Sequence, residues 1–152
     1  MFRAIVPAFA ALSLAWPASA EDIAVCDLSM NYCLPLIACI APTGEVLRGV
    51  SFGRNSGTLS AQSADGLRCS GAWSAGFEGV GAAEFTCSDG RSGRSATIYF
   101  EPKTGTNVGK IILADGTKAE FWVGDNLGRY FRELSPEQVQ AVGCAMDELL
   151  RR

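Results

Sequence analysis

The stretch LRCSGAWSAGFEGVGAAEFTC, residues 67–87, decides the fold of this chain. Alternation with a period of two runs through both of its halves, which is typical of strands with one buried face, and the glycines between them indicate a turn. Folding the stretch about its middle produces three opposed pairs: Cys69 with Cys87, Gly71 with Phe85, and Trp73 with Ala83. Opposed Cβ atoms lie about 5 Å apart or slightly less, a spacing that suits a disulfide. The stretch therefore predicts a β-hairpin closed by a Cys69–Cys87 disulfide.

Short alternating apolar runs separated by glycine-rich turns extend over residues 44–132. Three of the turns contain Asp-Gly, at 65–66, 89–90 and 115–116, which is a strong short-range hairpin signal. The pattern predicts an all-β fold, an antiparallel meander of about seven or eight strands curled into a barrel or a sandwich. Residues 34–40 are almost continuously apolar, so periodicity does not distinguish a short helix from a buried strand there.

The turns also predict how neighbouring strands pair. One turn places Phe52 opposite Gly57, and a turn at 90–93 places Phe85 opposite Ile98. A bulge at Gly116 keeps the apolar residues on both sides of that turn on the same face. Together these registers predict the following inward-facing apolar residues: Val46, Val50, Phe52, Leu59, Leu67, Trp73, Phe85, Ile98, Phe100, Ile111, Leu113, Phe121 and Val123.

Residues 1–20 have the three-part layout of a cleaved export signal. A basic residue at Arg3 precedes an apolar run, and the small residues of 18–20 follow it. The apolar run is short for a membrane span. We therefore expect cleavage near Ala20 and a periplasmic or secreted protein that has no membrane anchor after cleavage.

Residues 21–152 are predicted to form one disulfide-stabilised β domain. It consists of a cysteine-rich lead-in (21–43), the meander (44–132) and one C-terminal helix (135–151), which starts at a capping Ser-Pro sequence. All six cysteines of the chain lie in this domain, and an oxidising compartment favours disulfides. With Cys69 and Cys87 paired, the other four allow three pairings, which the sequence leaves open: Cys26, Cys33, Cys39 and Cys144.

Composition excludes several functions. The chain has no histidine, so Ser-His-Asp and Cys-His catalysis are excluded within one chain, as are zinc sites that need histidine. The formal net charge of −3 gives no basic footprint for nucleic acid. We therefore expect no enzyme activity, no metal or other cofactor, and no nucleic-acid partner.

Two groups of residues are candidates for an interaction site. The loop 88–94 carries Arg91 and Arg94, which would bind an anion if they converged; a solvated hairpin tip is the alternative. On the outer face of the later strands, Tyr99, Ile112 and Trp122 would form an apolar patch unless the C-terminal helix covers them. Strand glutamates at 84, 101 and 120 share that outer face with other polar residues, so we interpret them as a solvated surface.

The segment Phe85-Thr86-Cys87-Ser88-Asp89-Gly90, followed by the strand 96–100, resembles the opening motif of periplasmic inhibitors of C-type lysozyme. That family consists of small, secreted, disulfide-linked antiparallel β-barrels that insert a loop into the lysozyme cleft. Its second motif, a Ser-Gly segment leading to an aromatic residue, has no clear match in this chain. No functional residue is therefore carried over from the family.

These observations lead to a functional hypothesis with two alternatives. The first is an exported, non-enzymatic β protein that serves as an interaction or structural module, with an envelope or extracellular protein as partner. The second is an inhibitor of a secreted hydrolase such as a lysozyme, acting through the hairpin loop 88–94. The third is a small-ligand-binding barrel or a carboxylate-based hydrolase, which requires a pocket with polar groups. The sequence leaves the partner and the oligomeric state open.

Overall fold

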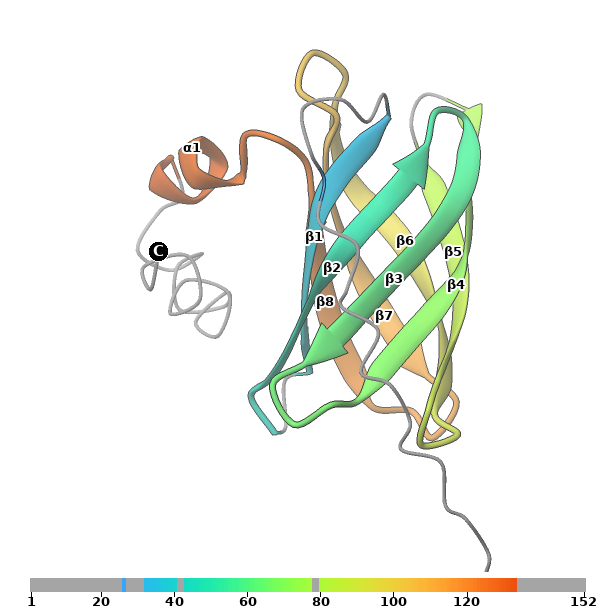
Figure 1. Cartoon of the computed structure of the whole chain (residues 1–152). Coiled ribbons are helices and arrows are strands. Elements are labelled where there is room, and N and C mark those ends of the chain that lie inside the picture. The colour runs from blue at the N-terminus through green and yellow to red at the C-terminus, as the bar shows by residue number, and fades with distance from the viewer. Residues whose placement is uncertain (1–25, 27–31, 41–42, 78–79, 134–152) are drawn as a thin grey trace, which may run out of the picture.

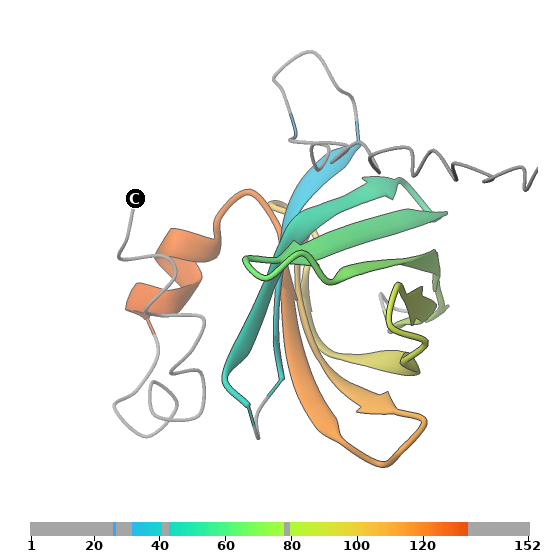
Figure 2. The ribbon, with the colours of Figure 1, turned by 60° about the horizontal axis from the view of Figure 1, so that its bottom comes forward.

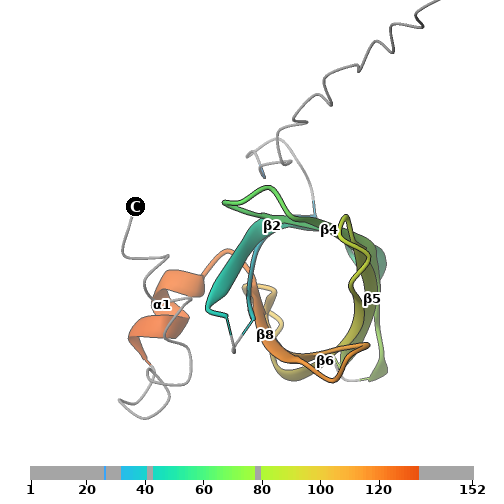
Figure 3. The same ribbon diagram turned by 90° about the horizontal axis from the view of Figure 1, so that it is seen from below.

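The computed structural model describes residue 26 and residues 32–40, 43–77 and 80–133. Within these ranges, eight antiparallel strands follow one another in sequence order, and β1 pairs with β8 to close a barrel (Figure 1). The strands are β1 (Cys33–Ile40), β2 (Glu45–Gly53), β3 (Ser56–Ser63), β4 (Arg68–Ala75), β5 (Gly81–Cys87), β6 (Ser92–Glu101), β7 (Thr106–Leu113) and β8 (Lys118–Val123). The predicted antiparallel meander is confirmed, and its shape is a barrel, seen end-on in Figure 3.

A short helix, α1 (Leu127–Arg132), follows β8 and lies outside the barrel wall (Figure 2). No helix in the described ranges is long and apolar enough to cross a membrane. The predicted export signal, the predicted helix at 135–151 and Cys144 lie outside the described residues.

The two ends of the barrel carry different sets of turns. The turns β1–β2, β3–β4, β5–β6 and β7–β8 lie at one end, at the bottom of Figure 1. Because three of these four turns contain Asp-Gly, we call it the Asp-Gly end. The turns β2–β3, β4–β5 and β6–β7 lie at the opposite end, together with the start of β1 and the exit from β8.

The three Asp-Gly turns share one geometry. Gly66, Gly90 and Gly116 have φ of +86°, +89° and +86°, and each donates its N–H to the carbonyl three residues earlier. In each turn, the residue that accepts this bond donates its own N–H to the carbonyl four residues later. Glycine adopts this left-handed conformation without a steric cost, and the extra residue makes a bulge. The predicted bulge at Gly116 is therefore observed.

The central hairpin has the predicted register, with Cys69 opposite Cys87 and Gly71 opposite Phe85. The next hairpin does not. Phe85 lies opposite Gly93 instead of Ile98, because the chain already turns at Asp89-Gly90 and β6 begins at Ser92. Ile98 consequently faces solvent and is 64% exposed, which corrects its predicted inward position.

The register between β2 and β3 is also different from the predicted one. Gly53 lies opposite Gly57, which shifts the pairing by one residue relative to the predicted Phe52–Gly57 pair. Because side chains alternate between the two faces of a sheet, a shift of one residue moves every side chain of the strand to the opposite face. The prediction that Val46, Val50 and Phe52 face inward is therefore wrong. They are on the outer face of β2, and the inward positions belong to Leu47, Gly49 and Ser51.

The remaining inward predictions agree with the structure. Leu59, Leu67, Phe85, Ile111, Leu113, Phe121 and Val123 belong to the barrel core or pack against it. Trp73 and Phe100 face the interior as well, the latter after an irregularity between Thr97 and Tyr99. The apolar run 34–40 is a strand whose two faces are both buried, which explains why it shows no alternation.

A second apolar cluster lies outside the barrel wall, under α1. Ile37 and Cys39 of β1 pack there with Val108, Trp122 and Leu127. Trp122 is 1% exposed whereas Ile112 is 59% exposed, so the candidate residues Tyr99, Ile112 and Trp122 do not form one exposed patch. The covering element within the described ranges is α1, whose apolar residues need a partner on the sheet. Tyr99 remains 44% exposed, and its ring contacts Tyr130 of α1 at 5.6 Å between centroids.

Candidate functional site

The interior of the barrel is not filled by side chains. It contains a cavity of about 660 Å³ that is lined by residues from all eight strands. An eight-stranded barrel is just wide enough either to be packed solid or to hold one small ligand. The registers of β2 and β6 explain the empty space, because they turn Ser51, Ser95 and Thr97 inward where larger apolar residues were predicted.

The cavity wall is mainly apolar. Leu36, Leu59, Phe85, Ile111 and Phe121 contribute to it from five different strands. The ring of Phe85 lies over Gly93 of the adjacent strand, where a Cβ on the glycine would come within 2.7 Å of the ring. The absence of a side chain on this glycine thus leaves room for the aromatic ring.

The Asp-Gly end of the cavity is closed by buried side chains. Leu47, Leu113 and Ala119 are 4%, 5% and 2% exposed. The disulfide between Cys69 and Cys87 joins β4 to β5 at the same level, with an S–S distance of 2.00 Å. These buried residues also line the cavity, so they form a packed layer that closes it at this end.

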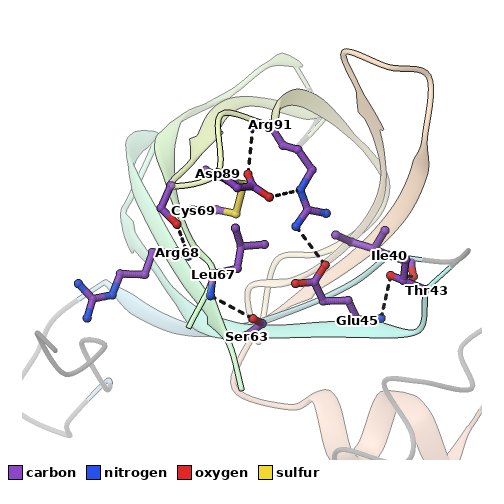
Figure 4. Close-up of polar contacts among 11 residues, drawn as sticks. Ile40, Thr43, Glu45, Ser63, Leu67, Arg68, Cys69, Asp89 and Arg91 are labelled. Carbon is purple, nitrogen blue, oxygen red and sulfur yellow. Dashed lines mark hydrogen bonds and ion pairs between the residues drawn. A yellow bond between two sulfur atoms is a disulfide. The ribbon is translucent and has the colours of Figure 1, made fainter. Parts of the chain in front are cut away.

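Arg91 crosses the barrel beside this packed layer and also lines the cavity. Its Nη2 lies 3.1 Å from Oε2 of Glu45, the first residue of β2. Arg91 directly precedes β6, and β2 and β6 are four strands apart in a ring of eight, so the ion pair joins opposite walls. Figure 4 shows the guanidinium reaching across the end of the barrel near Leu67 and Ile40. We call Arg91, Glu45 and Asp89 the strap.

Asp89 holds the arginine in this position. Its carboxylate accepts the backbone N–H of Arg91 at 3.0 Å and the side-chain Nε–H at 2.6 Å. The first of these bonds is the main reason why the pKa of Asp89 lies below its ordinary value of 3.8. The hydrogen bond to Asp89 likewise raises the pKa of Arg91. Both charges are thus favoured in the folded protein.

The opposite end of the cavity is open, and we call it the mouth. The cavity lining there includes residues of the β2–β3 and β6–β7 turns, among them Arg54 and Thr104. Large apolar side chains around the mouth are exposed to solvent: Tyr32, Phe52, Phe77, Val80 and Phe100. Exposed apolar groups of this kind commonly surround binding sites.

Uncharged polar groups line the wall formed by β6 and β7. Ser95, Thr97 and Asn107 all face the cavity. The Thr97 hydroxyl accepts the N–H of Gly81 at 3.1 Å, so part of its hydrogen-bonding capacity is used by the barrel itself. The Oδ1 atom of Asn107 is buried and has no hydrogen-bond partner among the described residues.

The predicted interaction residues do not come together. Arg91 belongs to the strap, whereas Arg94 faces outward from β6 opposite Glu84. Their side chains therefore project from opposite faces of the strand and do not converge on one anion. The glutamates at 84, 101 and 120 do not line the cavity. Glu120 instead pairs with Lys110 on the neighbouring strand.

The cysteines are disulfide-bonded wherever the structure describes them. Besides Cys69–Cys87, a disulfide joins Cys26 to Cys33 at the start of β1. Cys39 is also disulfide-bonded, to none of these four. In the described ranges, no group of three His, Cys, Asp or Glu side chains is arranged to hold a metal ion.

Sequence reasoning missed Ser95, Thr97 and Asn107. The signal for the first two was the repeat of the Asp-Gly turn, because the bulge predicted at Gly116 applies equally at Gly90. The same turn at both places would have set the register of β6 correctly. Asn107 follows from alternation along β7, since it lies four residues before the inward-facing Ile111.

Comparisons with known proteins add little to this description. No protein-family model matches the chain, and a search of curated proteins found no match. Among solved structures, the chain is similar to a de novo designed fluorescence-activating β-barrel. The two share 16% identity with a TM-score of 0.47, over 62% of this chain and 92% of the designed one. The cavity itself is therefore the main indication of what the protein does.

Proposed function

We propose that this protein is a non-enzymatic binding module that holds one small, mainly apolar molecule inside the barrel. The observation that carries the proposal is the cavity of about 660 Å³, which is open at the mouth and closed at the Asp-Gly end. Ligand pockets commonly have volumes of about 300–1,000 Å³ and mainly apolar walls with a few polar groups. Of the three sequence-based hypotheses, the small-ligand-binding barrel fits these features best.

The physical driving force is the removal of apolar surface from water. Each Å² of apolar surface that a ligand buries contributes roughly 25 cal/mol, before the cost of immobilising the ligand is subtracted. The closed sheet itself forms the cavity, so binding requires little reorganisation of the protein. Entry is through the mouth, because the strap and the packed layer obstruct the other end.

A fluorescent probe tests this proposal directly. N-phenyl-1-naphthylamine becomes strongly fluorescent in apolar surroundings, and we expect it to bind with a Kd on the order of micromolar. Ser95→Trp places a bulky ring inside the cavity and should weaken binding at least about tenfold. Ala96→Trp is the matched control, because Ala96 is the next residue of β6 and faces outward. Absence of probe binding to the unmodified protein, or equal binding to both variants, would contradict the proposal.

The hydrolase alternative lacks a comparable observation, since none of the three strand glutamates lines the cavity. Export, an envelope partner and lysozyme inhibition stay predictions from the sequence. Inhibition is separable from ligand binding, because it would use the turn at Asp89-Gly90, which lies at the end opposite the mouth. Full activity of a C-type lysozyme in the presence of excess protein would count against it.

A further inference from the structure

Several polar groups on the cavity wall already have partners within the barrel. The indole N–H of Trp73 donates to the Phe52 carbonyl at 3.2 Å, so its ring offers the cavity an apolar surface. Thr97 accepts from Gly81, and Arg91 is engaged by two carboxylates. These three side chains are therefore less available to a ligand.

Among the cavity-lining side chains of the described residues, Asn107 carries a buried oxygen atom that lacks a partner. It lies on β7 between Phe100 of β6 and Val123 of β8, with apolar side chains on both sides. Its side-chain amide lines the cavity, and its buried oxygen has no partner in the described part of the chain. A buried polar atom is more stable with a hydrogen-bond partner than without one, so a ligand group that pairs with this amide is favoured. Rotation about the last side-chain bond can present either end of the amide to the cavity.

We infer that the ligand carries an uncharged polar group, a hydroxyl or an amide, which hydrogen-bonds to the side-chain amide of Asn107 while the rest of the ligand fills the apolar cavity. This inference rests on the proposed function. A hydroxyl or an amide both donates and accepts, so it matches the amide in either orientation. An uncharged group fits because the cavity-lining polar residues of β6 and β7 are uncharged, whereas the charged residues of the lining lie at the two ends: Arg91 in the strap, and Arg54 and Asp125 at the mouth.

Two probes of nearly equal shape test the inference. They are 2-naphthol and 2-methylnaphthalene, which differ by a hydroxyl in place of a methyl group. The Kd of each is measured by displacement of N-phenyl-1-naphthylamine. The ratio of the two Kd values is then compared between variants, which removes the intrinsic difference in hydrophobicity between the probes.

Asn107→Leu removes the amide while keeping a side chain of similar size. We expect the ratio of the Kd of 2-naphthol to the Kd of 2-methylnaphthalene to rise by about 3–10-fold in this variant. A change of this size corresponds to the loss of one net hydrogen bond. Asn107→Ala is the second variant, in case the leucine disturbs packing. Ser51→Ala is the control, because Ser51 is an uncharged polar residue on another wall of the same cavity, and the ratio should stay within about twofold.

The outcomes separate the inference from the proposed function. If both probes bind and the ratio is unchanged in both Asn107 variants, the inference is wrong although the barrel still binds apolar molecules. If Ser51→Ala shifts the ratio as much as Asn107→Leu does, the polar contact is not at Asn107. If none of the three molecules binds the unmodified protein, the proposed function itself is wrong.

Discussion

The Asp-Gly end and the mouth belong to the same eight strands but are filled differently. At the Asp-Gly end, Leu47 and Leu113 are buried, the Cys69–Cys87 disulfide lies beside them, and the strap spans the opening. At the mouth, the aromatic residues Phe52 and Phe100 are exposed. The difference indicates that the Asp-Gly end contributes most to the stability of the barrel, whereas the mouth leaves space for a ligand.

The largest expected effect compares one core residue from each end. Leu113→Ala creates a void in a packed region, so we expect it to lower the free energy of unfolding by about 2–5 kcal/mol. Phe100→Ala removes a ring that already contacts solvent, and we expect a loss below about 1.5 kcal/mol together with weaker probe binding. Urea denaturation of both variants measures the difference. Equal losses of unfolding free energy in the two variants would show that the two ends contribute equally to stability.

The two described disulfides offer a second comparison. Removing Cys69–Cys87 frees a loop of 18 residues, and the chain-entropy relation predicts a loss of about 3 kcal/mol. Removing Cys26–Cys33, near the mouth, frees a loop of 7 residues and should cost about 2 kcal/mol. Double Cys→Ala variants, measured by thermal unfolding, test this order. A larger loss for the shorter loop would mean that native packing, and not the unfolded chain, sets the effect.

The strap should contribute less than either disulfide. Arg91→Gln removes the ion pairs of Arg91 with Glu45 and Asp89. All three side chains are partly exposed, and we expect a loss of about 1 kcal/mol. A double-mutant cycle with Glu45→Gln isolates the coupling across the barrel. Arg94→Gln is the control, because that side chain is exposed on the outer face and should change stability by less than about 0.5 kcal/mol. A coupling energy between Arg91 and Glu45 no larger than the stability change of Arg94→Gln would show that the strap contributes no more than a surface contact.

The smallest effect is the pH dependence of the strap. The pKa of Asp89 in the folded protein lies below its ordinary value of 3.8, mainly because of the Arg91 backbone N–H. Its contribution to stability is therefore fully present above that value and is lost as the pH falls through the lower, folded-state pKa. The difference in Tm between the unmodified protein and Asp89→Asn should be constant near neutral pH and shrink below about pH 4. A difference that grows on acidification would reverse the assigned sign.

Much of the fold follows from local sequence patterns. The central hairpin, its disulfide and the inward face of β7 and β8 were all predictable, because alternation and turn residues act over short distances. The wrong registers of β2 and β6 have one cause. A turn sequence shows where the chain reverses but leaves the pairing uncertain by a residue or more, and a shift by an odd number reverses the face of the strand.

The candidate site was less predictable than the fold. Its polar wall depends on the face of β6, and its volume depends on the small residues that the true registers turn inward. Arg91 was recognised as a candidate, but its partner Glu45 is 46 residues away in sequence. No local pattern indicates a contact between opposite walls of a barrel.

The sequence by itself determined the strand-turn alternation, the Cys69–Cys87 pair and the absence of histidine chemistry, because these depend on neighbouring residues or on composition. Only the tertiary structure decided that β1 pairs with β8, which faces of β2 and β6 point inward, and therefore that the interior contains a cavity. The physical reason is that closure of a barrel adjusts all strand registers together. Whether the interior is filled or hollow is a property of the complete ring.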